Sequence, residues 1–273
     1  MNSIQQQTAS IVMAAGRGSR MQGYGGNKTL LPLNPGDDPF HGSIPILSHI
    51  LGQLPPGPKA LVVHHCAKEV QEATRADRLS YFRQPLLNGT GGAILAARSF
   101  VQSTPCEQVL ITMGDVPFVS PETYKRLVGS LSTATMTVLG FCPGERKQYG
   151  LLEIAGARVE RITEWKYWRD YDPKRLQVLK VCNAGIYAAR KKALLHYLNL
   201  LAQRPQTVVK TIDGVQTAIE EYFITDLVEY MNADGLVVEW VCLLYTSPSP
   251  RDLRQDLVCR LLLENGGGGG GGG

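Results

Sequence analysis

Apolar runs of strand length alternate with helix-like segments through the first half of the chain. Ser43 is the expected N-cap of the first helix, because Pro45 is tolerated in a first turn. Such alternation predicts an α/β fold with a mainly parallel sheet and helices on both of its faces. Strands are predicted at residues 8–14, 59–64, 79–84 and 108–113, and helices at residues 44–54, 67–76 and 92–101.

The pattern changes in the second half, where strand-like segments follow one another through tight turns. Strands are predicted at residues 133–141, 150–156, 157–165 and 180–189, and helices at residues 191–203 and around 220–232. This succession predicts a small antiparallel lobe that extends the parallel sheet and carries a substrate site. We expect the folded domain to span residues 8–240, and residues 241–273, which end in a run of glycines, to form a disordered, non-native-looking tail.

A glycine-rich, basic loop follows the first predicted strand. Gly16 and Gly18 let backbone N–H groups approach an anion closely, because no Cβ intervenes. Arg17, Arg20 and Lys28 supply positive charge to the same region. This composition is typical of a loop that holds phosphate.

Known phosphate-loop patterns fit this loop only in part. Met21 stands where the dinucleotide fingerprint G-x-G-x-x-G has its third glycine. Asn27 separates Gly26 from Lys28, so the pattern G-x-x-x-x-G-K-[ST] fails as well. A plain surface turn therefore stays open at this point, and the loop alone does not identify a phosphate compound.

A second candidate lies where the predicted strand at residues 108–113 runs directly into Gly114 and Asp115. In open α/β sheets ligands bind at the carboxyl ends of the strands, so this carboxylate is placed for chemistry. A helix N-cap or a turn aspartate is the structural alternative, since both are common after strands.

Composition argues against several classes of protein. The chain has 273 residues, 44% of them hydrophobic, which is enough for a substantial core, and its net charge of +4 does not indicate binding to nucleic acid or a membrane. The six cysteines form no C-x-x-C pair, which argues against a zinc site and a dense disulfide framework. The sequence shows no signal peptide or bilayer-length apolar run, so we expect a cytoplasmic protein.

Eight motifs in a fixed order make the chain similar to a known family. They are MAAGRGSRM, KTLLPL, QPLLNGTGGA, MGDVPF, QYGLLEI, ITEWK, CNAGIY and EEYFITD. On these motifs, the chain from roughly Thr8 to Trp240 resembles the sugar-phosphate nucleotidylyltransferases, most closely the uridylyltransferase domains of bifunctional N-acetylglucosamine-1-phosphate uridylyltransferases. The resemblance implies a Rossmann-like, GT-A-like nucleotidyltransferase fold.

The resemblance also implies roles for individual residues. Arg20 and Lys28 match a phosphate-binding pair, and Asp115 matches a magnesium ligand, a hard carboxylate for a hard cation. Positions that match sugar-binding residues are Gly150, Glu164 and Asn183. Positions that match nucleotide-binding residues are Met13, Ala14, Ala15, Gly16, Lys28, Gln84, Gly89, Thr90, Met113 and Gly114. Among these, the Gln84 amide and the Gly89-Thr90 turn match the groups that read a uracil ring.

The implied reaction needs few protein groups. A phosphate oxygen of a sugar 1-phosphate, N-acetylglucosamine 1-phosphate by the closest resemblance, is already an anion and attacks the α-phosphorus of UTP without a general base. Arg20, Lys28 and Mg²⁺ on Asp115 would position the phosphates and neutralise their charge while pyrophosphate leaves. The implied partners are a nucleoside triphosphate and a sugar 1-phosphate, and the implied cofactor is Mg²⁺.

Departures from the family pattern keep other functions in view. The segment between Arg20 and Lys28 is one residue longer than usual and lacks a proline, and Leu151 replaces the usual arginine after Gly150. The insertion at residues 34–42 allows a sugar other than N-acetylglucosamine. A molybdopterin-type or other NTP transferase is one alternative, against which the motifs ITEWK, NAG and EYFITD argue. A non-catalytic sugar-nucleotide-binding module is the other, disfavoured because both Lys28 and Asp115 are present.

Overall fold

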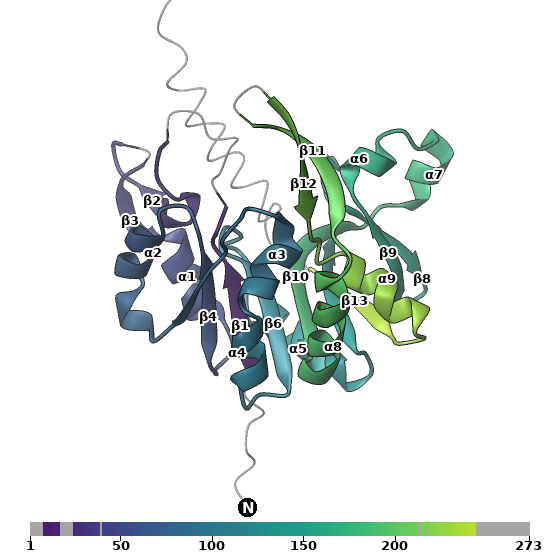
Figure 1. Ribbon diagram of the computed structural model, residues 1–273, viewed down its shortest axis with the longest axis horizontal. Coiled ribbons are helices and arrows are strands. Elements are labelled where there is room, and N and C mark those ends of the chain that lie inside the picture. The colour runs from purple at the N-terminus through teal and green to yellow at the C-terminus, as the bar shows by residue number, and fades with distance from the viewer. Residues whose placement is uncertain (1–7, 17–23, 39, 213–214, 244–273) are drawn as a thin grey trace, which may run out of the picture.

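A nine-stranded sheet runs through the part of the chain that the computed structural model describes, residues 8–16, 24–38, 40–212 and 215–243 (Figure 1). Its strands are β1 (Thr8–Met13), β4 (Lys59–Val63), β5 (Ser80–Arg83), β6 (Gln108–Met113), β7 (Met136–Phe141), β8 (Leu151–Ala155), β9 (Arg158–Thr163), β10 (Cys182–Arg190) and β13 (Val238–Cys242). They lie in the order β5-β4-β1-β6-β10-β7-β13-β9-β8.

The sheet has a parallel half and a mixed half. β5, β4, β1 and β6 pair with one another in parallel. β10 then lies antiparallel between β6 and β7, and β13 is parallel to β7. β9 and β8 complete the mixed half as an antiparallel pair. The expected α/β fold is therefore confirmed, and the expected antiparallel part continues the same sheet.

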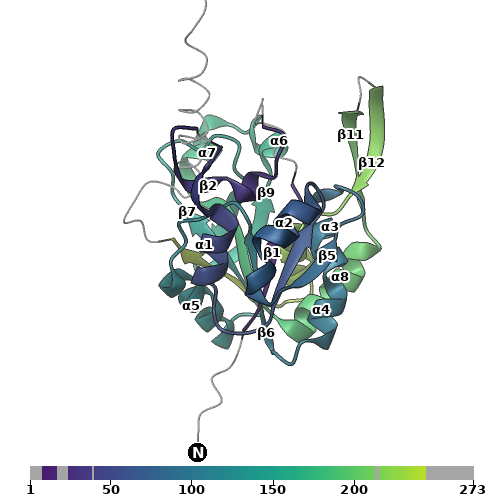
Figure 2. The ribbon, with the colours of Figure 1, turned by 90° about the vertical axis from the view of Figure 1, so that its left-hand side faces the viewer.

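Helices cover both faces of this sheet (Figure 2). They are α1 (Ile46–Gln53), α2 (Ala67–Ala73), α3 (Gly89–Ala96), α4 (Arg98–Ser103), α5 (Pro121–Gly129), α6 (Trp165–Trp168), α7 (Pro173–Val178), α8 (Lys191–Ala202) and α9 (Asp226–Ala233), with short 3₁₀ helices at Lys28–Leu30, Arg75–Asp77 and Ser130–Ser132. α3, α4, α8 and α9 contribute to the core on one face, and α1, α2 and α5 to the core on the other. Within the described ranges, every helix is too short or too polar to span a bilayer.

β1 explains why continuous apolar runs form the middle of the sheet. All six of its residues are buried. Ile11 and Met13 pack into the core beneath α3 and α4, whereas Val12 and Ala14 belong to the core beneath α1 and α5. Because alternate side chains of a strand point to opposite faces, only a strand covered on both sides tolerates such a run.

Among the described residues, two hairpins lie outside the main sheet. β2 (Pro32–Pro35) pairs with β3 (Gly42–Pro45), and β11 (Gln206–Ile212) pairs with β12 (Val215–Glu221), both antiparallel. The β11–β12 hairpin stands out from the body of the molecule (Figure 2). We did not expect it from the sequence, although the Asp213-Gly214 pair between two alternating segments is a hairpin signal.

Three expected helix boundaries are wrong. Ser43 is not an N-cap, since it lies in β3 and pairs with Asn34 of β2. α1 begins only after Pro45, because a proline disfavours helical backbone at the residue before it. The helix expected at residues 92–101 is split into α3 and α4 and begins at Gly89, so the expected Gly89-Thr90 turn is the first turn of α3. The helix expected around residues 220–232 begins only at Asp226, because Glu220 and Glu221 are the end of β12.

The sheet continues past the expected end of the domain at residue 240. β13 runs to Cys242, and the Leu243 amide donates a hydrogen bond to the Gly140 carbonyl at 2.8 Å. The rest of the expected tail, residues 244–273, lies outside the described residues.

The two-sided core predicts which leucines stabilise the fold. Leu110, in the middle of β6, is completely buried, so Leu110→Ala should lower the free energy of unfolding by about 3 kcal/mol. Leu86 is 69% exposed, and the matched change Leu86→Ala should lower it by less than about 0.5 kcal/mol. Urea unfolding followed by circular dichroism measures both, and equal losses would contradict this account of the core.

Candidate active site

The predicted nucleotide-binding residues meet at the carboxyl edge of the parallel strands. Met13 ends β1 and Gly114 follows β6, and the Gly114 amide donates a hydrogen bond to the Met13 carbonyl at 2.9 Å. A Cβ on Gly114 would lie 3.2 Å from the Cβ of Ala14, so glycine lets the two strand ends approach closely. Ala15 is buried and Gly16 is exposed.

Lys28 and Asp115 form an ion pair at this edge. The Lys28 Nζ contacts Asp115 Oδ2, and the Asp115 side chain is 9% exposed. A Cβ placed on Gly16 would lie 3.6 Å from the Lys28 Cε, so the lysine stem passes close to the glycine-rich loop. The structure thus brings together the predicted phosphate-binding lysine and the predicted metal ligand. Arg17 and Arg20 lie outside the described residues.

Gln84 lies at the same edge, after β5, and its amide has a fixed orientation. The Gln84 backbone N–H donates to the Val63 carbonyl at the end of β4. Its Nε2 donates to Asn88 Oδ1 at 3.0 Å and to the Gly89 carbonyl at 3.1 Å. Two acceptors at one end of the amide identify that end as the nitrogen. Gln84 is 2% exposed, and the oxygen of its side chain is the group left to accept a hydrogen bond from a ligand.

The predicted Gly89 and Thr90 are held by the segment after β12. Gly89 has a φ of +92°, and a Cβ there would lie 2.3 Å from the Tyr222 carbonyl, so the position requires glycine. The Tyr222 amide donates to the Asn88 carbonyl at 2.9 Å, and the Ile224 amide donates to Thr90 Oγ1 at 3.3 Å. The motif EEYFITD therefore fixes the start of α3.

The three predicted sugar-binding residues also lie together. The backbone N–H of Asn183 donates to the Gly150 carbonyl at 2.8 Å, and a Cβ on Gly150 would lie 3.5 Å from Glu164 Oε2. The Asn183 side chain already has partners within β10, since its Nδ2 donates to the Tyr187 hydroxyl and its Oδ1 accepts from the Gly185 amide. Direct contact of the Asn183 side chain with a sugar stays a prediction.

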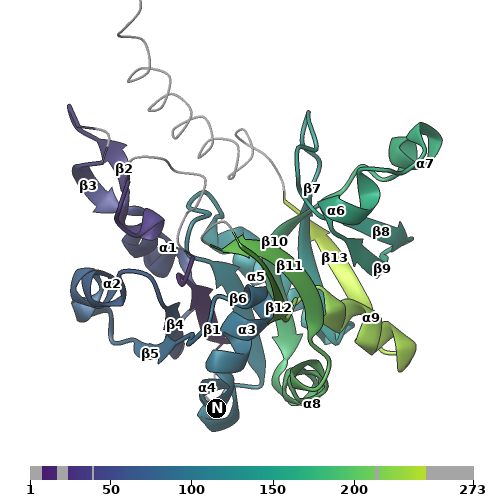
Figure 3. The same cartoon turned by 45° about the horizontal axis from the view of Figure 1, so that its top comes forward.

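The reversed direction of β10 brings this cluster to the nucleotide edge. β10 is antiparallel to β6 and begins at Cys182, so its first residues lie at the end of β6 that leads into Asp115. β10 lies beside β6 (Figure 3). One edge of the sheet therefore carries both predicted groups of residues.

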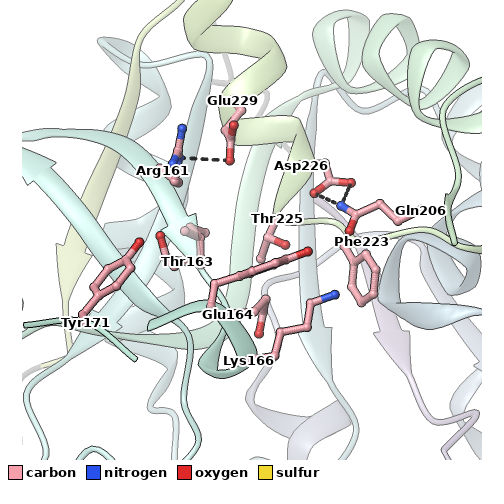
Figure 4. A pocket seen from close by; sticks show the side chains of 12 residues that line it. Arg161, Thr163, Glu164, Lys166, Tyr171, Gln206, Phe223, Thr225, Asp226 and Glu229 are labelled. Carbon is pink, nitrogen blue, oxygen red and sulfur yellow. Dashed lines mark hydrogen bonds and ion pairs between the residues drawn. The ribbon is translucent and has the colours of Figure 1, made fainter. Parts of the chain in front are cut away.

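A pocket of about 390 Å³ opens beside Glu164 (Figure 4). Arg161 on β9 and Glu229 on α9 form an ion pair across it at 3.3 Å. The residues that line it are Arg161, Ile162, Thr163, Glu164, Lys166, Tyr167, Tyr171, Gln206, Phe223, Thr225, Asp226 and Glu229. The pocket therefore joins the motif ITEWK, which contains the predicted sugar-binding Glu164, to the motif EEYFITD and the base of the β11–β12 hairpin.

Charged groups of this pocket are held in place by polar and aromatic neighbours. The Gln206 amide donates to both carboxylate oxygens of Asp226, at 2.9 and 2.8 Å. Burial raises the pKa of the Asp226 carboxyl, and the hydrogen bonds from Gln206 oppose that rise only in part. The Lys166 Nζ lies 4.6 Å from the centre of the Tyr167 ring and 5.4 Å from that of Phe223.

Pocket size alone does not locate the site. A larger pocket, about 1060 Å³, opens near the start of β1 and β6, at the amino edge of the parallel strands. None of the predicted site residues in the described part of the chain lines it. The chemistry of the side chains, not the volume of the pockets, therefore identifies the carboxyl edge of the sheet as the candidate site.

Sequence reasoning missed three residues of the site. In the sequence, Asn27 only breaks the phosphate-loop spacing before Lys28, yet in the structure it is completely buried and both ends of its side-chain amide are hydrogen bonded. Asn88 lies within the quoted motif QPLLNGTGGA, and it orients Gln84. Lys166 lies within ITEWK and lines the pocket beside Glu164. The motifs contained a signal for the last two, whereas nothing in the sequence distinguished Asn27.

The chain is similar to known proteins over most of its length. Residues 10–209 match the model of a family described as MobA-like NTP transferase domain. The bifunctional protein GlmU of Ruegeria sp. (strain TM1040) is 31% identical over 238 residues, which cover 85% of this chain and 47% of that protein. GlmU of Cereibacter sphaeroides (strain ATCC 17023) is 32% identical over 231 residues, covering 83% and 45%. The chain spans about half the length of these curated relatives.

A solved structure shares the fold. UDP-glucose pyrophosphorylase complexed with UDP-glucose gives a TM-score of 0.58 at 15% identity, over 86% of this chain and 90% of the other. The resemblance found in the motifs is confirmed by the GlmU relatives and by the family match, which covers more than half of the chain. On these grounds the chain belongs to the family of MobA-like NTP transferase domains.

Proposed function

We propose that this protein transfers UMP from UTP to a sugar 1-phosphate, N-acetylglucosamine 1-phosphate in the first place, and releases pyrophosphate. The observation that carries the proposal is the arrangement at one edge of the sheet. The pair Lys28 and Asp115 lies between Gln84 on one side and the cluster around Asn183 on the other. A charge-stabilising centre flanked by a base-reading amide and a hydroxyl-binding cluster suits a sugar nucleotide.

The orientation of Gln84 supports a base with a ring N–H. Both hydrogens of its amide are used by Asn88 and Gly89, so the side chain offers an acceptor to the ligand. Uracil, thymine and guanine carry a ring N–H that donates to such an acceptor, whereas the matching ring nitrogens of cytosine and adenine are acceptors themselves. Two acceptors facing each other in a buried site leave both unpaired, which disfavours CTP and ATP.

The chemistry then follows from positioning and charge. An oxygen of the sugar 1-phosphate forms a bond to the α-phosphorus of UTP while the bond from that phosphorus to the pyrophosphate oxygen breaks. The attacking oxygen is already an anion, so no proton has to be removed. Lys28 neutralises negative charge on the phosphates, and the exposed Gly16 after β1 has no Cβ to keep a phosphate from the backbone. Gly150 and Glu164 would hold the sugar hydroxyls.

The residues at this edge fit a magnesium ion held by one protein carboxylate. Asp115 is buried, and its Oδ2 already contacts one cation, the Lys28 ammonium. Within the described part of the chain, no three His, Cys, Asp or Glu side chains cluster as a complete metal cage. Mg²⁺ commonly binds through one or two carboxylates and completes its shell with substrate phosphates and water. When bound, it would neutralise phosphate charge.

A second candidate function is supported by the family match itself. Because the match is to MobA-like NTP transferase domains, transfer from another nucleoside triphosphate to a different acceptor is the main alternative. Guanine presents a ring N–H to Gln84 as uracil does. A preference for GTP over UTP would favour this alternative.

The base-reading geometry predicts a marked nucleotide preference. We expect kcat/KM with UTP to exceed that with ATP or CTP by roughly 10- to 100-fold, because each unpaired buried partner costs about 1–3 kcal/mol. The measurement is pyrophosphate release for a panel of nucleoside triphosphates against a panel of sugar 1-phosphates. Equal turnover of UTP and ATP would contradict the role of Gln84.

The charge-stabilising pair predicts a second result. Asp115→Ala should abolish magnesium-dependent turnover with the fold intact, and Lys28→Ala should lower kcat by roughly 10²- to 10³-fold through lost stabilisation of phosphate charge. Pyrophosphate release and circular dichroism measure activity and fold. Asp77→Ala, in a 3₁₀ helix away from this edge, is the matched control and should leave kcat unchanged. Near-normal rates in Asp115→Ala, or its unfolding, would show that the metal role is wrong.

A further inference from the structure

Asn27 is a completely buried asparagine immediately before Lys28. Its Nδ2 donates to the Ala14 carbonyl at 3.0 Å and to the His65 carbonyl at 2.8 Å. Its Oδ1 accepts from the Thr29 backbone N–H at 3.0 Å and from Thr29 Oγ1 at 2.9 Å. Both donor hydrogens and the acceptor oxygen of the amide are therefore used.

These four hydrogen bonds do two different things. The bond from the Thr29 amide caps the 3₁₀ helix that begins at Lys28, which a serine in this position also does. The bonds to Ala14 and His65 are long-range, since these carbonyls follow β1 and β4, 13 and 38 residues away in sequence. Only the second pair ties the segment to the edge of the sheet.

These two long-range hydrogen bonds hold the backbone from which the flexible side chain of Lys28 extends. Lysine carries its charge on a flexible four-carbon stem, so its ammonium is placed accurately only when its Cα is held and its head has a partner. Asp115 contacts the head. Asn27 holds the backbone one residue away, against the same strand end that leads into the glycine-rich loop.

His65 reinforces the same attachment from the other side. Its Nε2 lies 3.1 Å from the Gly25 carbonyl, while its own backbone carbonyl accepts from Asn27. The segment before Lys28 is thus attached at two points to the residues after β4. These two contacts reach a distant part of the chain, so they do more than stabilise a local turn.

We propose that Asn27 is a positioning residue that sets the reach of Lys28 toward the phosphates and Asp115. The role in turnover rests on the nucleotidyl transfer proposed above, whereas the positioning itself does not. This role also explains why the phosphate-loop spacing fails in the sequence. The residue inserted between Gly26 and Lys28 is Asn27, which attaches the segment to the sheet.

A double-mutant cycle tests the role in turnover. Asn27→Ala removes all four bonds, and Asn27→Ser keeps the cap on Thr29 but is too short to reach Ala14 and His65, so it retains the fold if the alanine variant does not. We expect each to lower kcat about 10-fold or more, because small misplacements of a charged group are expensive in the transition state. In the Lys28→Ala background the same changes should alter kcat by less than about twofold, since residues that act through one another are not additive.

Asn232 provides a matched control. Its Nδ2 also donates to two backbone carbonyls, those of Val159 and Glu160, at 2.7 and 3.0 Å, but it lies on α9. Asn232→Ala should lower stability and leave kcat unchanged. Equal, additive losses of kcat for the Asn27 variants in both backgrounds would overturn the proposal.

A second readout does not depend on activity. Trace acetylation followed by peptide mass spectrometry reports how readily each lysine reacts, with Lys125, which is 80% exposed, as the internal reference. We expect Asn27→Ser to raise the labelling of Lys28 severalfold relative to Lys125, because the ammonium leaves Asp115 more often. Unchanged labelling would overturn the positioning role. If the unmodified protein releases no pyrophosphate with any substrate pair, the proposed function fails, while this labelling still tests Asn27.

Discussion

The ion pair between Lys28 and Asp115 joins segments that are 87 residues apart, and the site depends on it. A buried carboxylate is expensive unless a cation and hydrogen bonds compensate it, so both groups must be held accurately. Asp115 follows the end of β6, at the edge of the sheet. Lys28 comes from outside the sheet, and Asn27 attaches its backbone to the ends of β1 and β4. The same sheet edge therefore supplies one partner and anchors the other.

Reversal of a single strand extends this edge to a second group of residues. A further parallel strand beside β6 would place its first residues at the opposite edge, away from Asp115. β10 is antiparallel, so Asn183 and the adjoining Gly150 lie at the carboxyl edge. The strand has a bulge between Asn183 and Tyr187, and the Asn183 side-chain amide donates a hydrogen bond to the Tyr187 hydroxyl across it. This contact holds the backbone conformation at Asn183. A mixed sheet thus brings together residues that a purely parallel sheet would separate.

The part of the site that we propose to read the base depends on residues distant in sequence as well. Gln84 presents its oxygen because Asn88 and Gly89 engage its nitrogen. Gly89 in turn lies against Tyr222, more than a hundred residues later, at a distance that excludes any Cβ. A change in the segment after β12 would therefore alter the orientation of the Gln84 side-chain amide. The motif EEYFITD gains a physical role from this contact.

The sequence by itself determined the parallel half of the sheet, because strands buried on both faces are continuous apolar runs that local residues display. It also located Lys28, Asp115 and Gln84, through motifs and their places after strands. The tertiary structure alone decided the role of Asn27, because its hydrogen-bond partners are backbone carbonyls that carry no side-chain signal. It likewise decided where α3 begins, because Gly89 owes its conformation to a contact with Tyr222. Local pattern specifies burial and periodicity, whereas partners distant in sequence are specified only when the chain is folded.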